Sequence, residues 1–352
     1  MSSPLFRNDA ERPAEFGRIY PLDPEWLAKA PAEEVLFPEL PIVDPHHHLW
    51  DLPGYRYLLD EFTADTSSGH HVVGTVFAEC LAGYRPDGPE SLRPVGETEF
   101  ATALADEAAS DDARPDVAAG VIGFADLRLG DAVEEVLQEH VRAGRGRFKG
   151  IRFATSWDDD PVIENSHTGS APHLLADPVV RKGMAKLRDL GLSLDTWVFF
   201  PQLDDVAAAA DAVPDLSFVL DHCGGPLGYG RYAGRTDEDF ATWRRGVRAV
   251  AERPNTTCKL GGLVARLAAF DYRTAERPPS SVELAELWRP WIETCIDAFG
   301  PDRCMFESNY PVDAVGVPYR TLWNTFKRIT EPMTDSERTD LFAGTARRVY
   351  DL

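Results

Sequence analysis

Short β-rich runs alternate with amphipathic helical stretches along most of this 352-residue chain, and this alternation limits the possible folds more than any other feature. Eight runs have the apolar, β-branched character of strands: 42–43, 72–80, 117–124, 148–153, 192–199, 216–220, 256–260 and 304–306. Helical stretches lie between them at 97–110, 131–141, 178–190, 203–212, 238–251 and 282–299. Strands that alternate with helices form a parallel sheet, and eight is the number that closes into a barrel. We therefore predict an α/β fold, a single-domain (β/α)8 TIM barrel over residues 41–352.

The first 40 residues differ from the rest, because they are rich in proline and acidic residues and lack sustained periodicity. We predict that residues 1–40 form an N-terminal arm on the surface of the barrel domain. The arm is also the segment that could contact a second copy in a homo-oligomer.

The charge of the chain limits its partners. It contains 36 basic and 58 acidic residues, which gives a net charge of −22. Such a surface repels phosphate backbones and anionic lipids. We therefore expect a small-molecule substrate, and neither nucleic acid nor a membrane as partner.

The cysteines indicate the compartment. There are five, an odd number, and no two form a CxxC pair. The first residues lack the basic and apolar regions of a secretion signal, and no apolar run is long enough to span a membrane. We predict a cytoplasmic protein with reduced thiols.

The lengths of the connections indicate where function lies. Long segments follow the predicted strands at 49–70, 81–96, 154–177, 221–236 and 261–280, whereas a helix-to-strand join such as that at Gly191 is short. Barrel enzymes build their active sites from the loops at the carboxyl ends of the strands. We therefore expect the site at that face.

The first strand runs into three consecutive histidines. Alternate side chains of a strand share a face, so His46 and His48 should point the same way and His47 the opposite way. Two imidazoles on one face form a metal-binding pair. The alternative is a cluster that only packs and hydrogen-bonds at the strand end.

Polar side chains also occur in or just after five of the other predicted strands. They are Glu79, Lys149 and Arg152, Asp195, Trp197 and Gln202, Asp221 and His222, and finally Glu307, Ser308, Asn309 and Asp313. Because the carboxyl ends of the strands meet at one face of a barrel, we expect these residues to gather there.

Four segments resemble a known family: residues 43–50 (VDPHHHLW), 148–152 (FKGIR), 220–226 (LDHCGGP) and 305–312 (MFESNYPV). They look like the amidohydrolase-related TIM-barrel family, in the branch that contains lactonases such as 2-pyrone-4,6-dicarboxylate hydrolase, fuconolactonase and 4-sulfomuconolactone hydrolase. The resemblance covers residues 41–352. It implies that His46 and His48 match the metal pair, and that His222 ligates metal or polarises a carbonyl.

The chain departs from this pattern at Asn309, where the resemblance implies an aspartate that takes a proton from water. An amide has essentially no basicity, so Asn309 can only hydrogen-bond the substrate or ligate weakly. The acid–base role must then move to Glu307, Asp313, Glu79 or His222. Glu307 is favoured because a strand residue two positions away shares the face of Asn309.

The resemblance allows one divalent ion, zinc or manganese, held by His46 and His48 with Glu79 or His222. The predicted fifth strand supplies no histidine, and Arg152 lies near where a bridging lysine would sit, which argues against a binuclear centre. A metal-independent reaction stays open.

Several residues are candidates for substrate contact. Arg152 can clamp a carboxylate through its planar fork. Glu79 either contacts the ligand or pairs with Arg152, since a carboxylate ending an apolar strand needs a partner. Trp50, Gln202 and Tyr310 complete the predicted substrate set. Five histidines on loops or helices are expected to be incidental: His70, His71, His140, His167 and His173.

These observations predict a hydrolase that opens a lactone or related cyclic ester of a small organic acid. Histidines, with or without one metal ion, would polarise the carbonyl, and a carboxylate near the last strand would activate water. The alternatives are a metal-dependent, non-oxidative decarboxylase and a barrel that has lost catalysis and only binds.

Overall fold

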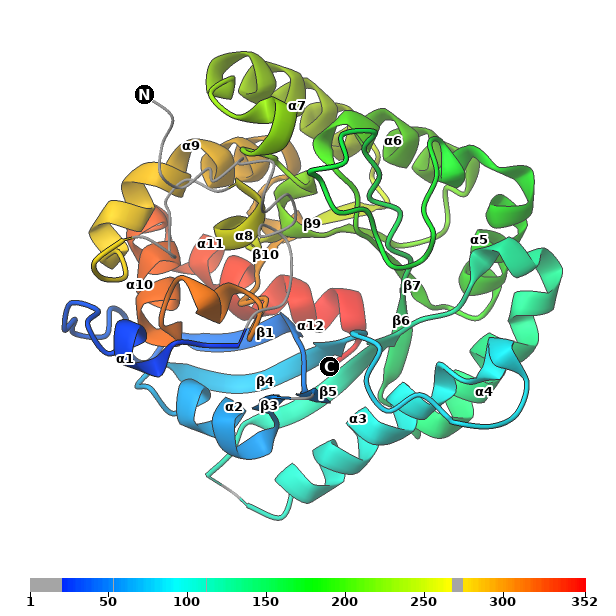
Figure 1. The fold of residues 1–352 in the computed structure, drawn as a ribbon, viewed down its shortest axis with the longest axis horizontal. Helices are drawn as coiled ribbons and strands as arrows, with labels where there is room; N and C mark the ends of the chain where they lie inside the picture. Colours follow the sequence, from blue (N-terminus) through cyan, green and yellow to red (C-terminus); the bar gives the residue numbers. More distant parts are fainter. Residues whose placement is uncertain (1–20, 53, 112, 268–274) are drawn as a thin grey trace.

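The computed structural model describes residues 21–52, 54–111, 113–267 and 275–352. In these residues, eight parallel strands form one sheet whose order follows the chain (Figure 1). They are β1 (Pro41–His47), β4 (His71–Ala78), β5 (Asp116–Gly123), β6 (Phe148–Arg152), β7 (Ser193–Thr196), β8 (Phe218–Leu220), β9 (Thr256–Leu260) and β10 (Cys304–Phe306). Each strand lies within two residues of a predicted run except β1, which extends beyond the expected 42–43, and β7, which ends three residues early.

Contacts between the first and last strands close the sheet. His47 bridges Tyr310 in parallel, and the backbone N–H of Asn309 donates to the carbonyl of His46 over 2.9 Å. The N–H of His48 donates to the carbonyl of Tyr310 over 2.7 Å. The predicted (β/α)8 barrel is confirmed.

Helices surround the strands in Figure 1. The main ones are α3 (Val95–Ala108), α4 (Val133–Gly144), α5 (Pro178–Asp189), α6 (Leu203–Ala212), α7 (Thr236–Ala251), α9 (Ser281–Phe299) and α10 (Tyr319–Ile329). Their ends follow local chemistry: Asp177 caps α5 ahead of Pro178, and Ser280 caps α9 with Glu283 in a capping box. Among the described helices, none is both long enough and apolar enough to cross a bilayer.

The connection between β1 and β4 contains regular structure. Residues Trp50–Leu52 (β2) pair antiparallel with Tyr55–Tyr57 (β3), and α2 (Leu59–Thr66) follows. Both strands have only three residues, so their pattern is too short to predict from sequence. The helices after β10 were also not predicted, including α10, α11 (Asp335–Thr339) and α12 (Thr345–Tyr350).

An apolar cluster joins the strands to the C-terminal segment. It combines Val43, Val76, Ile122, Val219 and Met305 of the strands with Ala343, Ala346 and Tyr350. In Figure 1, α12 lies across the middle of the ring of strands. This packing covers one end of the barrel, so the polar strand ends meet at the other.

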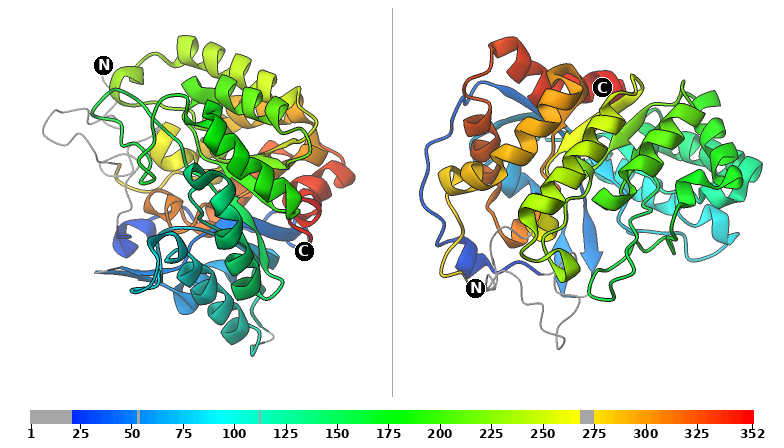
Figure 2. Two further views of the ribbon diagram at one scale, coloured as in Figure 1. Left: turned by 90° about the vertical axis from the view of Figure 1, so that its right-hand side faces the viewer. Right: turned by 90° about the horizontal axis from the view of Figure 1, so that it is seen from above.

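Residues 21–40 pack along the outside of the barrel, beside α9 and α10 (Figure 2). They contain α1 (Pro24–Leu27). Glu33 accepts hydrogen bonds from Ser281 and Asn324, and the N–H of Leu36 donates to Asn324. The first half of the predicted arm, residues 1–20, lies outside the described residues, and both the domain division and the homo-oligomer stay predictions.

Candidate active site

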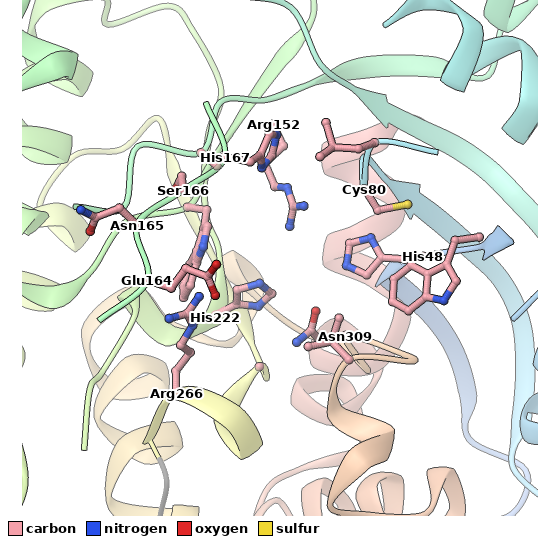
Figure 3. A pocket seen from close by; sticks show the side chains of 16 residues that line it. His48, Cys80, Arg152, Glu164, Asn165, Ser166, His167, His222, Arg266 and Asn309 are labelled. Atoms are coloured by element: carbon pink, nitrogen blue, oxygen red, sulfur yellow. The ribbon is translucent and has the colours of Figure 1, made fainter. Parts of the chain in front are cut away.

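A cavity of about 520 Å³ opens where the strands end, on the face predicted from the loop lengths (Figure 3). Its lining comes from residues that end or follow seven of the eight strands: His48, Trp50, Cys80, Leu81, Arg152, Ala154, Glu164, Asn165, Ser166, His167, Trp197, His222, Gly262, Arg266, Asn309 and Val312. Parallel strands deliver residues that are distant in sequence to one place.

The two histidines at the end of β1 lie on one face, as predicted. The ring centroids of His46 and His48 are 4.9 Å apart, whereas His47 turns away to stack on Phe62. Nδ1 of His48 lies 2.8 Å from the carbonyl oxygen of Ala78. Because a carbonyl only accepts, Nδ1 carries the proton and Nε2 is left with its lone pair. Burial, together with His46 and Arg152, lowers the pKa of His48 well below its usual value, so the ring is neutral at pH 7.

Arg152 and Glu79 form a buried ion pair. Nε of Arg152 donates to the Glu79 carboxylate over 2.8 Å, and Nη2 donates to the Glu79 carbonyl over 2.6 Å. The structure thus gives Glu79 the role of partner to Arg152, and it does not line the cavity. His167, expected to be incidental, does line the cavity, with Nε2 3.5 Å from Oε2 of Glu79.

His222 is supported from behind by Glu307. Oε1 of Glu307 lies 2.7 Å from Nδ1 of His222 and accepts the backbone N–H of the same residue over 3.1 Å. Burial alone would raise the pKa of Glu307, but His222 and His46 outweigh it and lower that pKa to about 2. A carboxylate on Nδ1 keeps the proton there, so Nε2 of His222 is available as a base. The ring of Trp197 packs edge-on against it, 4.7 Å away.

Asn309 and Asp313 form a second polar pair. The amide nitrogen of Asn309 donates to Oδ1 of Asp313 over 3.1 Å, and Asn309 alone of the two lines the cavity. Burial raises the pKa of Asp313 to about 7. The argument that Glu307 shares the face of Asn309 was wrong, because β10 ends at Phe306 and Asn309 has a left-handed backbone with φ 53°. Glu307 instead lies behind His222.

Lys259, on β9, belongs to the site but was not predicted. Its fully buried ammonium lies 2.6 Å from Asp195, 3.3 Å from Asp221 and 3.2 Å from Nδ1 of His46. Burial acts to lower the pKa of Lys259, but the two aspartates raise it.

A sequence signal for Lys259 does exist. A lysine in the apolar strand Thr256–Leu260 needs a buried partner, and two glycines follow. At Gly262, φ is 63° and any Cβ would collide with the imidazole of His222, so glycine is required for His222 to pack there.

Among the described residues, one group could hold a divalent metal ion: His46, Asp221 and His222, whose donor atoms lie within 4.8 Å of one another. Within the described part of the chain, neither carboxylate oxygen of Asp221 has a hydrogen-bond partner, although Oδ1 lies 3.3 Å from the Lys259 ammonium. The donor set differs from the predicted one. Asp221 joins His46 and His222 in this group, and the predicted ligands His48 and Glu79 are not among its members.

Of the predicted substrate residues Trp50, Gln202 and Tyr310, one lines the cavity and two do not. Trp50 lines the cavity, stacked on His48 with centroids 5.9 Å apart. Gln202 does not, because its amide holds the backbone at Thr155, Trp157 and Phe199. Tyr310 also does not, since its buried hydroxyl donates to the carbonyl of Val317. The side chains of Gln202 and Tyr310 therefore bind loop backbone, and neither residue lines the cavity.

The chain is similar in sequence to several known proteins. The chain is 31% identical over 325 residues to L-fucono-1,5-lactonase of Burkholderia multivorans, a match that covers 88% of this chain and 96% of that protein. It is 25% identical over 342 residues to L-rhamnono-γ-lactonase of Scheffersomyces stipitis, with 88% and 96% covered. An uncharacterised protein of Sinorhizobium fredii is 30% identical over 344 residues, with 89% and 99% covered.

Solved structures show the same relationship. A crystal structure of a Burkholderia multivorans amidohydrolase with bound zinc has a TM-score of 0.68 and 27% identity, covering 88% of this chain and 99% of that one. A second crystal form of that protein with bound HEPES gives the same values. The family model described as amidohydrolase matches residues 43–352. The chain therefore belongs to the amidohydrolase family and is an enzyme of the amidohydrolase superfamily.

Proposed function

We propose that this enzyme hydrolyses a lactone of a small organic acid, and that sugar-acid lactones are the substrate class to test first. The observation that carries the proposal is the pair of His222 and Glu307, 2.7 Å apart, with the imidazole at the cavity wall. Two of the related proteins bear the names of sugar lactonases. The polar lining suits a polyhydroxylated ring.

In the proposed reaction, Nε2 of His222 takes a proton from water and the water oxygen attacks the lactone carbonyl. Glu307 keeps Nδ1 protonated and stabilises the imidazolium that forms. The ring C–O bond then breaks, and the imidazolium returns the proton to the departing oxygen. Lactone and water become one hydroxy acid.

Arg152 is the residue best placed to stabilise the negative charge on the carbonyl oxygen. The guanidinium of Arg152 has five N–H groups on three nitrogens. Each nitrogen makes one contact, Nε and Nη2 with Glu79 and Nη1 with His46. The remaining N–H groups can face the cavity, which Arg152 lines. A fixed donor aimed at the developing oxyanion contributes strongly to catalysis.

His48 and Asn309 are proposed to bind the substrate hydroxyls. Nε2 of neutral His48 is an acceptor, and the amide of Asn309 is oriented by Asp313. Figure 3 shows His48, His222 and Asn309 around the same part of the cavity. If a divalent ion, zinc or manganese, binds this enzyme, then His46, Asp221 and His222 would hold it, and it would supply polarisation of the substrate carbonyl. His222 would then act as a ligand and could not also be the base.

The test is hydrolysis of a panel of 1,5- and 1,4-lactones of sugar acids, followed by proton release at pH 7.5 and by product mass. We expect ring opening by the native enzyme and a loss of about 100-fold or more in kcat for His222→Gln, as for removal of a general base. His173→Gln is the control, because His173 is exposed, pairs with Asp205 and does not line the described cavity. Hydrolysis that His222→Gln leaves unchanged would refute the mechanism, and carbon dioxide release without ring opening would identify a decarboxylase.

A further inference from the structure

The ammonium of Lys259 lies beside the candidate metal group. It is 3.2 Å from Nδ1 of His46 and 3.3 Å from Oδ1 of Asp221, two of the three donors in that group. It is fully buried. A divalent ion bridging His46 and Asp221 would therefore meet a positive charge already in place.

The lone pair of His46 is also engaged. A neutral imidazole has one lone pair, on either Nδ1 or Nε2. Nε2 faces Nη1 of Arg152 at 3.2 Å, while Nδ1 faces both the Lys259 ammonium at 3.2 Å and Oε2 of Glu307 at 3.1 Å. Whichever nitrogen carries the lone pair, a cationic N–H group lies against it. A metal ion could bind His46 only by displacing Arg152 or Lys259.

Displacing the ammonium of Lys259 or the guanidinium of Arg152 is energetically unfavourable. The Lys259 ammonium is held at 2.6 Å by Asp195, whose carboxylate also accepts the hydroxyl of Tyr350 over 2.8 Å. Displacing the ammonium would leave the buried carboxylates of Asp195 and Asp221 without their counter-ion, and an unpaired buried charge is strongly unfavourable. Arg152 is anchored by its two bonds to Glu79.

We propose that the Lys259 ammonium is the resident cation of this site, occupying the position of a metal ion, and that it keeps the affinity for divalent metal low. Lys259 also supplies the positive charge that orients Asp221 and balances Asp195. The cation is then part of the polypeptide, and loading with metal is not required for the site to be complete.

The test measures zinc binding without any substrate, so its outcome does not depend on the proposed lactonase activity. The full chain is treated with a chelator and titrated with zinc by calorimetry, with metal content checked by elemental analysis. We expect the native chain to bind zinc no more tightly than about 10 μM, and Lys259→Met to bind it about 100-fold more tightly, because a unit charge next to the ion is removed.

Lys327→Met is the matched control. Lys327 is also buried, but its ammonium contacts the carbonyl of Phe37 and the ring of His70, outside the site. We expect its zinc affinity to equal that of the native chain. Circular dichroism and thermal melting establish that both variants are folded.

Two results would overturn the proposal. One is a folded Lys259→Met variant with native zinc affinity. The other needs no variant of Lys259: tight one-to-one zinc binding by the native chain that is lost in His46→Ala. If Lys259→Met does not fold, this second measurement decides, and native binding weaker than about 10 μM supports the proposal.

Discussion

Two buried carboxylates lie close together in sequence, Glu307 just after β10 and Asp313 in the turn that follows. Their pKa values are shifted in opposite directions. Glu307 and Asp313 are 0% and 1% exposed. The pKa of Glu307 is lowered to about 2, whereas that of Asp313 is raised to about 7. Burial is the same for both, so the partner makes the difference: two imidazoles for Glu307 and an amide for Asp313.

This comparison identifies the carboxylate that we propose takes over from the aspartate that the family resemblance implies at position 309. A carboxylate that stays ionised can hold His222 in the tautomer that accepts a proton. Asp313 instead accepts a hydrogen bond from Asn309, a neutral amide that cannot take up a proton from water. We therefore assign Glu307 to proton transfer through His222, and Asp313 to the positioning of Asn309.

The largest expected effect is that of Glu307→Gln on the reaction rate. The amide cannot stabilise an imidazolium and can force the wrong tautomer, so kcat should fall by at least about 100-fold. Steady-state kinetics on the best lactone measures it. Asp313→Asn is the matched comparison and should lower kcat by less than about 10-fold. Equal losses in the two variants would contradict the distinction between the carboxylates.

A second prediction concerns Asn309→Asp, which places an acidic residue where this chain departs from the pattern that the family resemblance implies. The new carboxylate would lie about 3 Å from that of Asp313, and two such groups cannot both ionise. We expect no gain in kcat and a melting temperature lower than the native one by about 3 °C or more at pH 8, with a smaller difference at pH 5. Differential scanning fluorimetry at the two pH values measures this.

A different conclusion would follow if the Asn309→Asp variant hydrolysed lactones and the native chain did not. It would favour the alternative of a barrel that has lost catalysis and acts in binding.

The smallest expected effect is on the pH dependence of stability in Asp313→Asn. The folded pKa of Asp313, about 7, lies above its ordinary value of 3.8, so the folded state holds the proton more tightly than the unfolded state. This contribution to stability is present at low pH and is lost as the pH rises from about 4 to about 7. The variant has no carboxyl group at position 313, so it does not lose this stability as the pH rises. Its melting temperature relative to the native chain should therefore increase by about 3 °C between pH 5 and pH 8.

Native and variant melting curves recorded in the same buffers test this, since other groups titrate equally in both chains. A difference that does not change with pH would mean that Asp313 is ionised throughout that range, as Glu307 is.

Much of this fold could be read from local patterns. Strand β9 at Thr256–Leu260 and helix α6 at Leu203–Ala212 have the bounds predicted from their apolar and β-branched residues. The pairing of His46 with His48 followed from the period of two in a strand. The hairpin of β2 and β3 could not be predicted, because three-residue strands carry too little pattern.

The contacts between side chains in the site were harder to predict from the sequence. Glu79 had two open interpretations, and only the position of Arg152, 73 residues away, decided for the ion pair. The placement of Glu307 depended on where β10 ends and on the left-handed backbone of Asn309, neither of which alternation reveals. Gln202 and Tyr310 have residue types that suit substrate binding, but their hydrogen bonds go to nearby loops.

The sequence by itself therefore determined the barrel, the face that carries the site, the histidine pair and the departure at Asn309. Tertiary structure alone decided which buried charges meet. Lys259 and His46 are 213 residues apart, and their contact exists only because closure of the barrel brings β9 next to β10 and β10 next to β1. Periodicity reports which side of a strand a residue faces, whereas the charge and the role of a buried group depend on the partner that the fold places beside it.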